Sequence, residues 1–130
     1  MSSRILIIDD DDATLEVFRA VLEDDGYEVT LSNIAFEEIE DVEQLYPDLI
    51  ILDLMLGSYK AGWDFLQKLE THSSTKDIPV ILCSAATLEV GKYEDELRQK
   101  GITVVYKPFD LEGLLQAVSR FLPVPPTTSQ

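Results

Sequence analysis

Five side chains that could carry chemistry stand directly after short apolar runs of the chain: Asp9, Asp10, Asp53, Ser84 and Lys107. Three carboxylates held within a few ångströms repel one another, at roughly a few kcal/mol for each close pair. A hard divalent cation with oxygen ligands, Mg²⁺ or Mn²⁺, would remove that repulsion. The set therefore predicts a metal-assisted site for phosphoryl chemistry, with one carboxylate as the nucleophile.

The hydroxyl and ammonium groups complete this chemistry. Lys107 would pair with one phosphoryl oxygen, and Ser84 would donate a hydrogen bond to another. Both interactions arise only when a phosphoryl group is present, so they predict a switch that a local change of charge operates.

The elements that must position these residues alternate along the chain. Short continuous apolar runs, such as 5–8 and 49–52, indicate strands buried on both faces, and helical apolar patterns follow each of them. Segment 27–31 alternates polar and apolar residues, which indicates a half-exposed edge strand. We expect an α/β, flavodoxin-like, doubly wound (βα)5 fold, with a five-stranded parallel sheet in the order 2-1-3-4-5. Ligands of such sheets bind at the carboxyl ends of the strands.

Some helices have weaker signals. Asn33 is predicted to cap the second helix. Segment 57–62 is predicted to be a loop, with the third helix beginning at Trp63. The helix over 87–100 has the weakest pattern, because Gly91 lies inside it.

Length and charge set limits on the classes of protein. The chain has 130 residues, which we interpret as one domain over residues 1–122 with a disordered tail or linker over 123–130. A net charge of -15 disfavours direct binding to nucleic acid or to anionic membranes. No apolar stretch is long enough to span a bilayer, and no signal peptide is recognisable, so we expect a cytoplasmic protein.

Four motifs then occur in order at the predicted strand ends: Ile7-Ile8-Asp9-Asp10, Leu52-Asp53, Cys83-Ser84-Ala85 and Tyr106-Lys107-Pro108-Phe109. With them, residues 4 to about 122 resemble the receiver domain of two-component response regulators, of the chemotaxis-regulator type. The resemblance implies that the chain is not an enzyme but a signal-transduction module of a phosphorelay. It implies that Asp53 is the phosphoacceptor, charged by a sensor histidine kinase or a phosphotransfer protein.

The resemblance also assigns the metal site and the switch. Asp10 and Asp53 would bind Mg²⁺ directly, Asp9 largely through water, and the backbone carbonyl of Met55 would complete the site. The remaining implied positions are the switch residues Ser84 and Lys107, with Ala85 and Pro108 in support. The implied partner on the output side is a downstream protein or an output domain, and the implied assembly is a monomer or weak dimer.

Two positions differ from the family pattern. Gly57 stands four residues after Asp53, where the family usually has proline, and the loop to Gly62 is about one residue longer. Val104 stands three residues before Lys107, where the family has its switch aromatic. The resemblance therefore predicts intact phosphorylation chemistry with a different readout.

Other functions remain open at this point. The segment from Asp10 to Thr14 formally matches the Asp-x-Asp-x-Thr signature of haloacid dehalogenase-type phosphatases, which also use a strand-end hydroxyl and a lysine. A receiver-like module that works without phosphorylation is a second alternative. A flavodoxin-like cofactor binder is disfavoured, because the aspartates after the first strand would repel a phosphate. His72 lies in a polar loop and is interpreted as solvated, without a partner for catalysis or metal binding.

Overall fold

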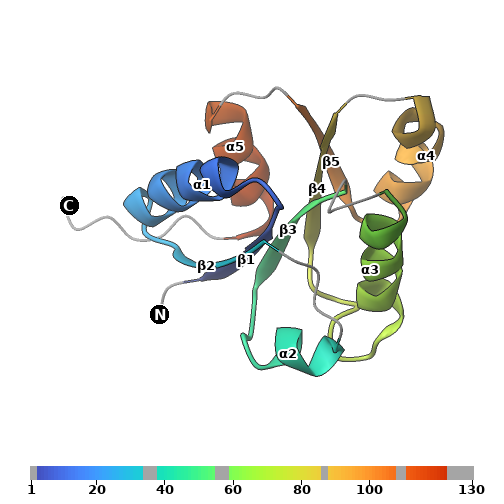
Figure 1. The fold of residues 1–130 in the computed structure, drawn as a ribbon, viewed down its shortest axis with the longest axis horizontal. Coiled ribbons are helices and arrows are strands. Elements are labelled where there is room, and N and C mark those ends of the chain that lie inside the picture. The colour runs from blue at the N-terminus through green and yellow to red at the C-terminus, as the bar shows by residue number, and fades with distance from the viewer. Residues whose placement is uncertain (1–2, 34–37, 55–58, 86–87, 108–110, 123–130) are drawn as a thin grey trace.

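The computed structural model describes residues 3–33, 38–54, 59–85, 88–107 and 111–122. Strands and helices alternate strictly through this part of the chain (Figure 1). In chain order the elements are β1 (Arg4–Ile8), α1 (Asp12–Asp24), β2 (Glu28–Ser32), α2 (Ile39–Glu43), β3 (Leu49–Asp53), α3 (Tyr59–Thr71), β4 (Val80–Ala85), α4 (Leu88–Gln99), β5 (Thr103–Lys107) and α5 (Leu111–Phe121).

The strands form one parallel sheet in the order β2-β1-β3-β4-β5, which confirms the predicted fold class and strand order. Every residue of the central strand β3 is buried, because helices cover both faces of the sheet there. Strand β2 lies at an edge and exposes Glu28 and Thr30. Its alternating sequence follows from that half-exposed position.

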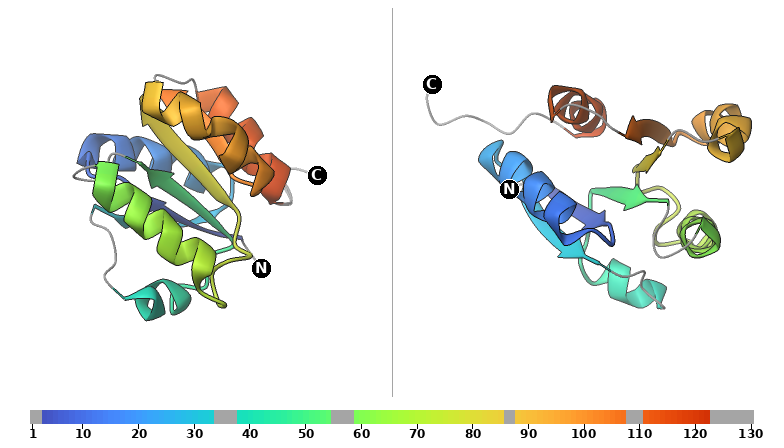
Figure 2. Two further views of the ribbon diagram at one scale, coloured as in Figure 1. Left: turned by 90° about the vertical axis from the view of Figure 1, so that its right-hand side faces the viewer. Right: turned by 45° about the horizontal axis from the view of Figure 1, so that its top comes forward.

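Each face of the sheet has its own hydrophobic core. On one face, Ile51 packs in a cluster with Phe18 of α1 and Val118 of α5. On the other face, Ile50 packs in a cluster with Leu66 of α3, and α2 and α4 contribute to the same cluster. Figure 2 shows these two helical layers on either side of the sheet. Both layers anchor the strands, so the loops at the strand ends start from a rigid base.

The described side chains of helix α4, at residues 91–99, hold it to this core at few points. Among its residues 91–99, Leu97 is the one buried side chain. Gly91 lies in the same stretch, with open space where a Cβ atom would be. Segments with few buried apolar contacts open most easily, so the described part of α4 belongs to the low-stability end of the fold.

Two helix boundaries differ from the prediction. Glu38 has an extended backbone and precedes α2, so Asn33 does not cap that helix. The Asn33 amide instead donates to Asp12 Oδ1 at 3.5 Å, across to the start of α1. Helix α3 begins at Tyr59, which places Gly62 inside a helix and not in a loop. In both cases contacts between elements determine where the helix begins, which the local sequence pattern does not.

The predicted tail over 123–130 lies outside the described residues, so the domain boundary at residue 122 stays a prediction. Within the ranges that the structure describes, no helix is both long enough and apolar enough to cross a bilayer.

Candidate functional site

Three aspartates meet at the carboxyl edge of the sheet. Ile8 and Leu52 are partners in the register of β1 and β3, so Asp9 and Asp53 are the next residues on two neighbouring strands. Asp10 follows, and each of the three carboxylates offers an oxygen atom within 4.8 Å of the other two. The predicted convergence of these side chains is confirmed.

Burial differs within this aspartate cluster, by which we mean Asp9, Asp10 and Asp53. Asp9 is 1% exposed and Asp53 is 6% exposed, whereas Asp10 faces solvent. The Asp9 carboxylate accepts a hydrogen bond from the Asp11 backbone N–H at 2.9 Å, and its own N–H donates to the Ser32 carbonyl at 3.1 Å. The first bond orients the Asp9 carboxylate from the loop that follows it, and the second holds the Asp9 backbone to the end of β2.

Backbone bonds also hold the carboxyl end of strand β3. Beyond Asp53, the Leu54 N–H donates to the Cys83 carbonyl at 3.0 Å, so the chain stays against β4 as it leaves β3. The aspartate cluster therefore combines fixed carboxylates with one solvent-facing member. Oxygen donors at this spacing are a ligand set that suits a hard divalent cation and relieves the repulsion between the three charges.

The hydroxyl and ammonium residues lie on the other side of Asp53. Asp53 is the register partner of Cys83, and the fully buried Ser84 is the next residue of β4. Lys107 ends β5 as the register partner of Ala85. The backbone thus brings these positions to the same edge as the aspartates. Met55 and Pro108 lie outside the described residues, so their predicted roles stay predictions.

The phosphatase-like signature belongs to a helix start. Asp11 is the N-cap of α1: its carboxylate accepts from the Ala13 N–H at 3.2 Å and from the Thr14 hydroxyl at 2.6 Å. Asp12 is exposed in the first turn. Both carboxylates favour the helix N-terminus electrostatically, which is a sufficient reason for them to occur there.

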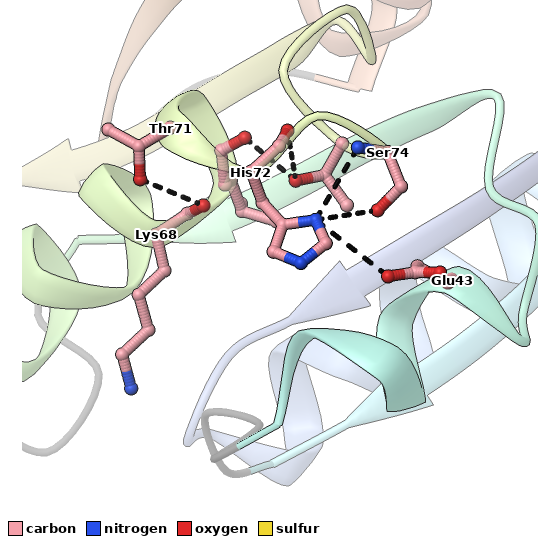
Figure 3. Close-up of polar contacts among 7 residues, drawn as sticks. Glu43, Lys68, Thr71, His72 and Ser74 are labelled. Carbon is pink, nitrogen blue, oxygen red and sulfur yellow. Dashed lines mark hydrogen bonds and ion pairs between the residues drawn. The ribbon is translucent and has the colours of Figure 1, made fainter.

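A second polar cluster joins α2 to the segment after α3. His72 Nδ1 lies 2.9 Å from Ser74 Oγ and 3.8 Å from Glu43 Oε1, as Figure 3 shows. Glu40, Glu43 and His72 also each offer a metal-ligand atom, and these three atoms lie within 4.8 Å of one another. His72 therefore has side-chain partners that the sequence pattern does not signal, and the prediction that it takes no part in catalysis or metal binding stays a prediction. The cluster precedes β3 and β4 and so lies at the opposite edge of the sheet from Asp53.

Sequence reasoning missed two residues near the site. A Cβ atom added at Gly62 would lie 1.8 Å from the Leu54 carbonyl oxygen, so α3 touches the backbone just after Asp53. The sequence pattern did not signal that contact, because it placed Gly62 in a loop and not in α3. The Tyr106 hydroxyl of β5 donates to Glu94 of α4, a contact that the sequence pattern does not signal.

The fold and this aspartate cluster are those of a signalling receiver module. A family model for the response regulator receiver domain matches residues 5–119. The chain therefore belongs to the response regulator receiver domain family of two-component signalling, which confirms the resemblance and disfavours the phosphatase and cofactor-binder alternatives.

Curated relatives agree with this assignment. The chain is 36% identical over 122 residues to the DNA-binding dual master transcriptional regulator RpaA of Synechocystis, covering 92% of this chain and 48% of RpaA. It is 32% identical over 126 residues to the phosphate regulon transcriptional regulatory protein PhoB of Escherichia coli, covering 92% of this chain and 53% of PhoB. The chain thus spans about half the length of these two relatives.

Solved structures show the same fold. The chemotaxis protein CheY4 of Vibrio cholerae superposes with a TM-score of 0.78 at 26% identity, covering 94% of this chain and 100% of CheY4. A CheY-like receiver domain protein from Methanospirillum hungatei superposes with a TM-score of 0.77 at 27% identity, covering 92% of this chain and 93% of that chain.

Proposed function

We propose that this receiver domain accepts a phosphoryl group on Asp53 in a Mg²⁺-dependent step, and that the phosphoryl group changes its affinity for a partner protein. The observation that carries the proposal is the aspartate cluster, whose carboxylate oxygens lie within 4.8 Å of one another at the ligand-binding edge of a doubly wound sheet.

The chemistry at Asp53 is a phosphoryl transfer. One Oδ atom attacks phosphorus and forms a P–O bond, the P–N bond of a phosphohistidine breaks, and the leaving imidazole retains its electron pair and takes up a proton. The product is an acyl phosphate on Asp53. Mg²⁺, held by the aspartate cluster with the Met55 carbonyl, would supply charge neutralisation for the phosphoryl oxygens.

The other site residues act on the product. The Ser84 hydroxyl donates a hydrogen bond to one phosphoryl oxygen, and the Lys107 ammonium pairs with another, with Ala85 and Pro108 supporting them. Each contact forms only with the phosphorylated state, so the binding energy of both residues shifts the balance between two conformations of the domain.

The partners follow from the same role. The phosphoryl donor is a sensor histidine kinase or a phosphotransfer protein, and the receiver of the signal is a downstream protein or an output domain. The net charge of -15 favours partners with basic surfaces over direct contact with nucleic acid. We place the domain in the cytoplasm, as a monomer or weak dimer that signals and does not turn over a substrate.

The test is incubation of the purified chain with a small acyl phosphate and Mg²⁺, followed by intact mass measurement. We expect a gain of one phosphoryl group, and no gain when a chelator removes the cation, because three uncompensated carboxylates repel the donor. A wild-type chain that gains no phosphoryl group with Mg²⁺ present would contradict the proposal and favour an interaction module that works without phosphorylation.

Mg²⁺ alone provides a further check. Because a ligand that binds only the folded state stabilises it, millimolar Mg²⁺ should raise the melting temperature of the wild type. The rise should be much smaller in Asp10→Asn, which removes the solvent-facing ligand. An equal rise in both proteins would contradict metal binding by the aspartate cluster.

A further inference from the structure

Tyr106 occupies a central position between the switch residues. In the register of β4 and β5 it is the direct partner of Ser84, and the next pair is Ala85 with Lys107. Its half-buried ring packs against the same core cluster that α3 and α4 cover. Any shift of Ser84 or Lys107 toward a phosphoryl group therefore acts on the backbone to which Tyr106 belongs.

The Tyr106 side chain connects this backbone to α4. Its hydroxyl donates to Glu94 Oε1, and Glu94 Oε2 pairs with Arg98 Nη2 at 2.7 Å, one helical turn further along α4. The hydrogen bond to Glu94 raises the pKa of the Tyr106 phenol above its usual value, and desolvation adds to the rise. The phenol therefore remains a protonated donor at neutral pH.

In the described part of α4, few buried side chains add to this connection. Among residues 91–99 of α4, Leu97 is the one buried side chain. The exposed Tyr93 contacts Trp63 of α3 edge-on, with ring centroids 5.5 Å apart and planes at 69°. Between α3 and α4 lies a groove of about 460 Å³ that both rings line. Figure 2 shows the two helices on the same side of the sheet. The shape of the groove therefore depends on where α4 sits.

We propose that the hydrogen-bonded link from Tyr106 through Glu94 to Arg98 transmits the state of the Asp53 site to α4, and so changes the groove between α3 and α4. The inference rests on the proposed phosphorylation of Asp53. In this proposal the hydrogen bond between the Tyr106 hydroxyl and the Glu94 carboxylate reports the state of Asp53, and Tyr106 stands one residue before Lys107. The position three residues before Lys107, where the family has its aromatic, holds the buried Val104, which has no polar group to offer.

A small shift at the end of β5 can move α4, because the described part of this helix is weakly held to the core. A helix with one buried anchor in its described part moves at low cost, and a charge-assisted hydrogen bond is among its strongest attachments. When the end of β5 moves with Lys107, Glu94 either follows the hydroxyl or loses it. Either response displaces α4 relative to α3 and alters the Trp63–Tyr93 contact.

The chain contains a built-in probe for this displacement, since Trp63 is its single tryptophan. The experiment measures Trp63 emission before and after phosphorylation with a small acyl phosphate and Mg²⁺, with phosphoryl uptake followed by intact mass in the same samples. We expect wild type to change its emission on uptake. Tyr106→Phe removes only the hydroxyl, and should take up the phosphoryl group fully but lose most of the emission change.

Three further variants serve as controls for Tyr106→Phe. Tyr46→Phe makes the same chemical change at an exposed tyrosine outside the link and should behave as wild type. Glu94→Ala should lose the emission change as Tyr106→Phe does, and the double variant should lose no more than either alone, because both substitutions break one interaction.

The outcomes separate the two proposals. A wild type that gains no phosphoryl group overturns the proposed function and this inference with it. A wild type that is phosphorylated without an emission change overturns the inference alone. The inference alone is also overturned if Tyr106→Phe keeps the full change in Trp63 emission. It is likewise overturned if the double variant loses the sum of the two single-variant losses.

Discussion

Asp53→Asn is expected to abolish phosphoryl uptake while leaving the fold intact. Asparagine has nearly the same size as aspartate but lacks the anionic oxygen that attacks phosphorus, so no acyl phosphate can form. Asp53 is 6% exposed at the end of the buried strand β3, where an isosteric replacement preserves packing. Intact mass after incubation with an acyl phosphate and Mg²⁺ measures the result.

A matched control lies close by. Asp12→Asn makes the same change at an exposed carboxylate in the first turn of α1, outside the aspartate cluster, and should keep uptake at the wild-type level. Uptake that persists in Asp53→Asn would show that another residue is the acceptor. Loss of uptake in both variants would point to the overall negative charge and not to a specific nucleophile.

The same substitution has an expected effect on stability. In buffer without divalent cations, Asp53→Asn removes one of three mutually repelling charges, which should raise the free energy of unfolding by on the order of 1 kcal/mol. Denaturant unfolding monitored by circular dichroism measures this quantity. A lower stability would show that hydrogen bonds to the Asp53 carboxylate outweigh the repulsion.

Gly62→Ala is expected to lower the free energy of unfolding strongly. The added Cβ would lie 1.8 Å from the Leu54 carbonyl oxygen and 2.7 Å from its carbon, and these backbone atoms cannot rotate away. Either α3 or the backbone after Asp53 must shift, at a cost of about 3 kcal/mol in the free energy of unfolding. Because Leu54 follows Asp53, phosphoryl uptake should fall as well.

Gly91→Ala is the control for this substitution. It adds the same methyl group to another helical glycine, but nothing lies within 4 Å of the new atom. Alanine has the higher helix propensity, so we expect a gain of about 0.5 to 1 kcal/mol in stability. Denaturant unfolding should show changes of opposite sign in the free energy of unfolding of the two variants. Equal effects would contradict the close approach of α3 to Leu54.

Much of the fold was predictable because its determinants are local. Continuous apolar runs such as 49–52 define strands buried on both faces, and the alternating segment 27–31 defines the edge strand. Strict alternation with helices then leaves few topologies. The convergence of Asp9 with Asp53 follows from the same logic, since residues after parallel neighbouring strands must meet at one edge of the sheet.

The starts of helices α2 and α3 were less predictable, because the conformational preference of a residue type competes with packing between elements. Asn33 is a good helix cap by type, but the second helix starts after Glu38, so Asn33 contacts α1 instead. Glycine is a residue type that favours loops, yet Gly62 lies inside α3. Only glycine, which lacks a Cβ atom, lets the helix lie this close to the Leu54 backbone.

The sequence by itself determined the strand order and the positions of the aspartate cluster, because periodicity and strand-end residues carry that information directly, and its four strand-end motifs carried the resemblance to the receiver family. Tertiary structure alone decided which side chains from distant elements meet: Tyr106 with Glu94, and His72 with Glu43. These pairs depend on how helices pack on the sheet, and packing angles and side-chain directions are not encoded in any local pattern.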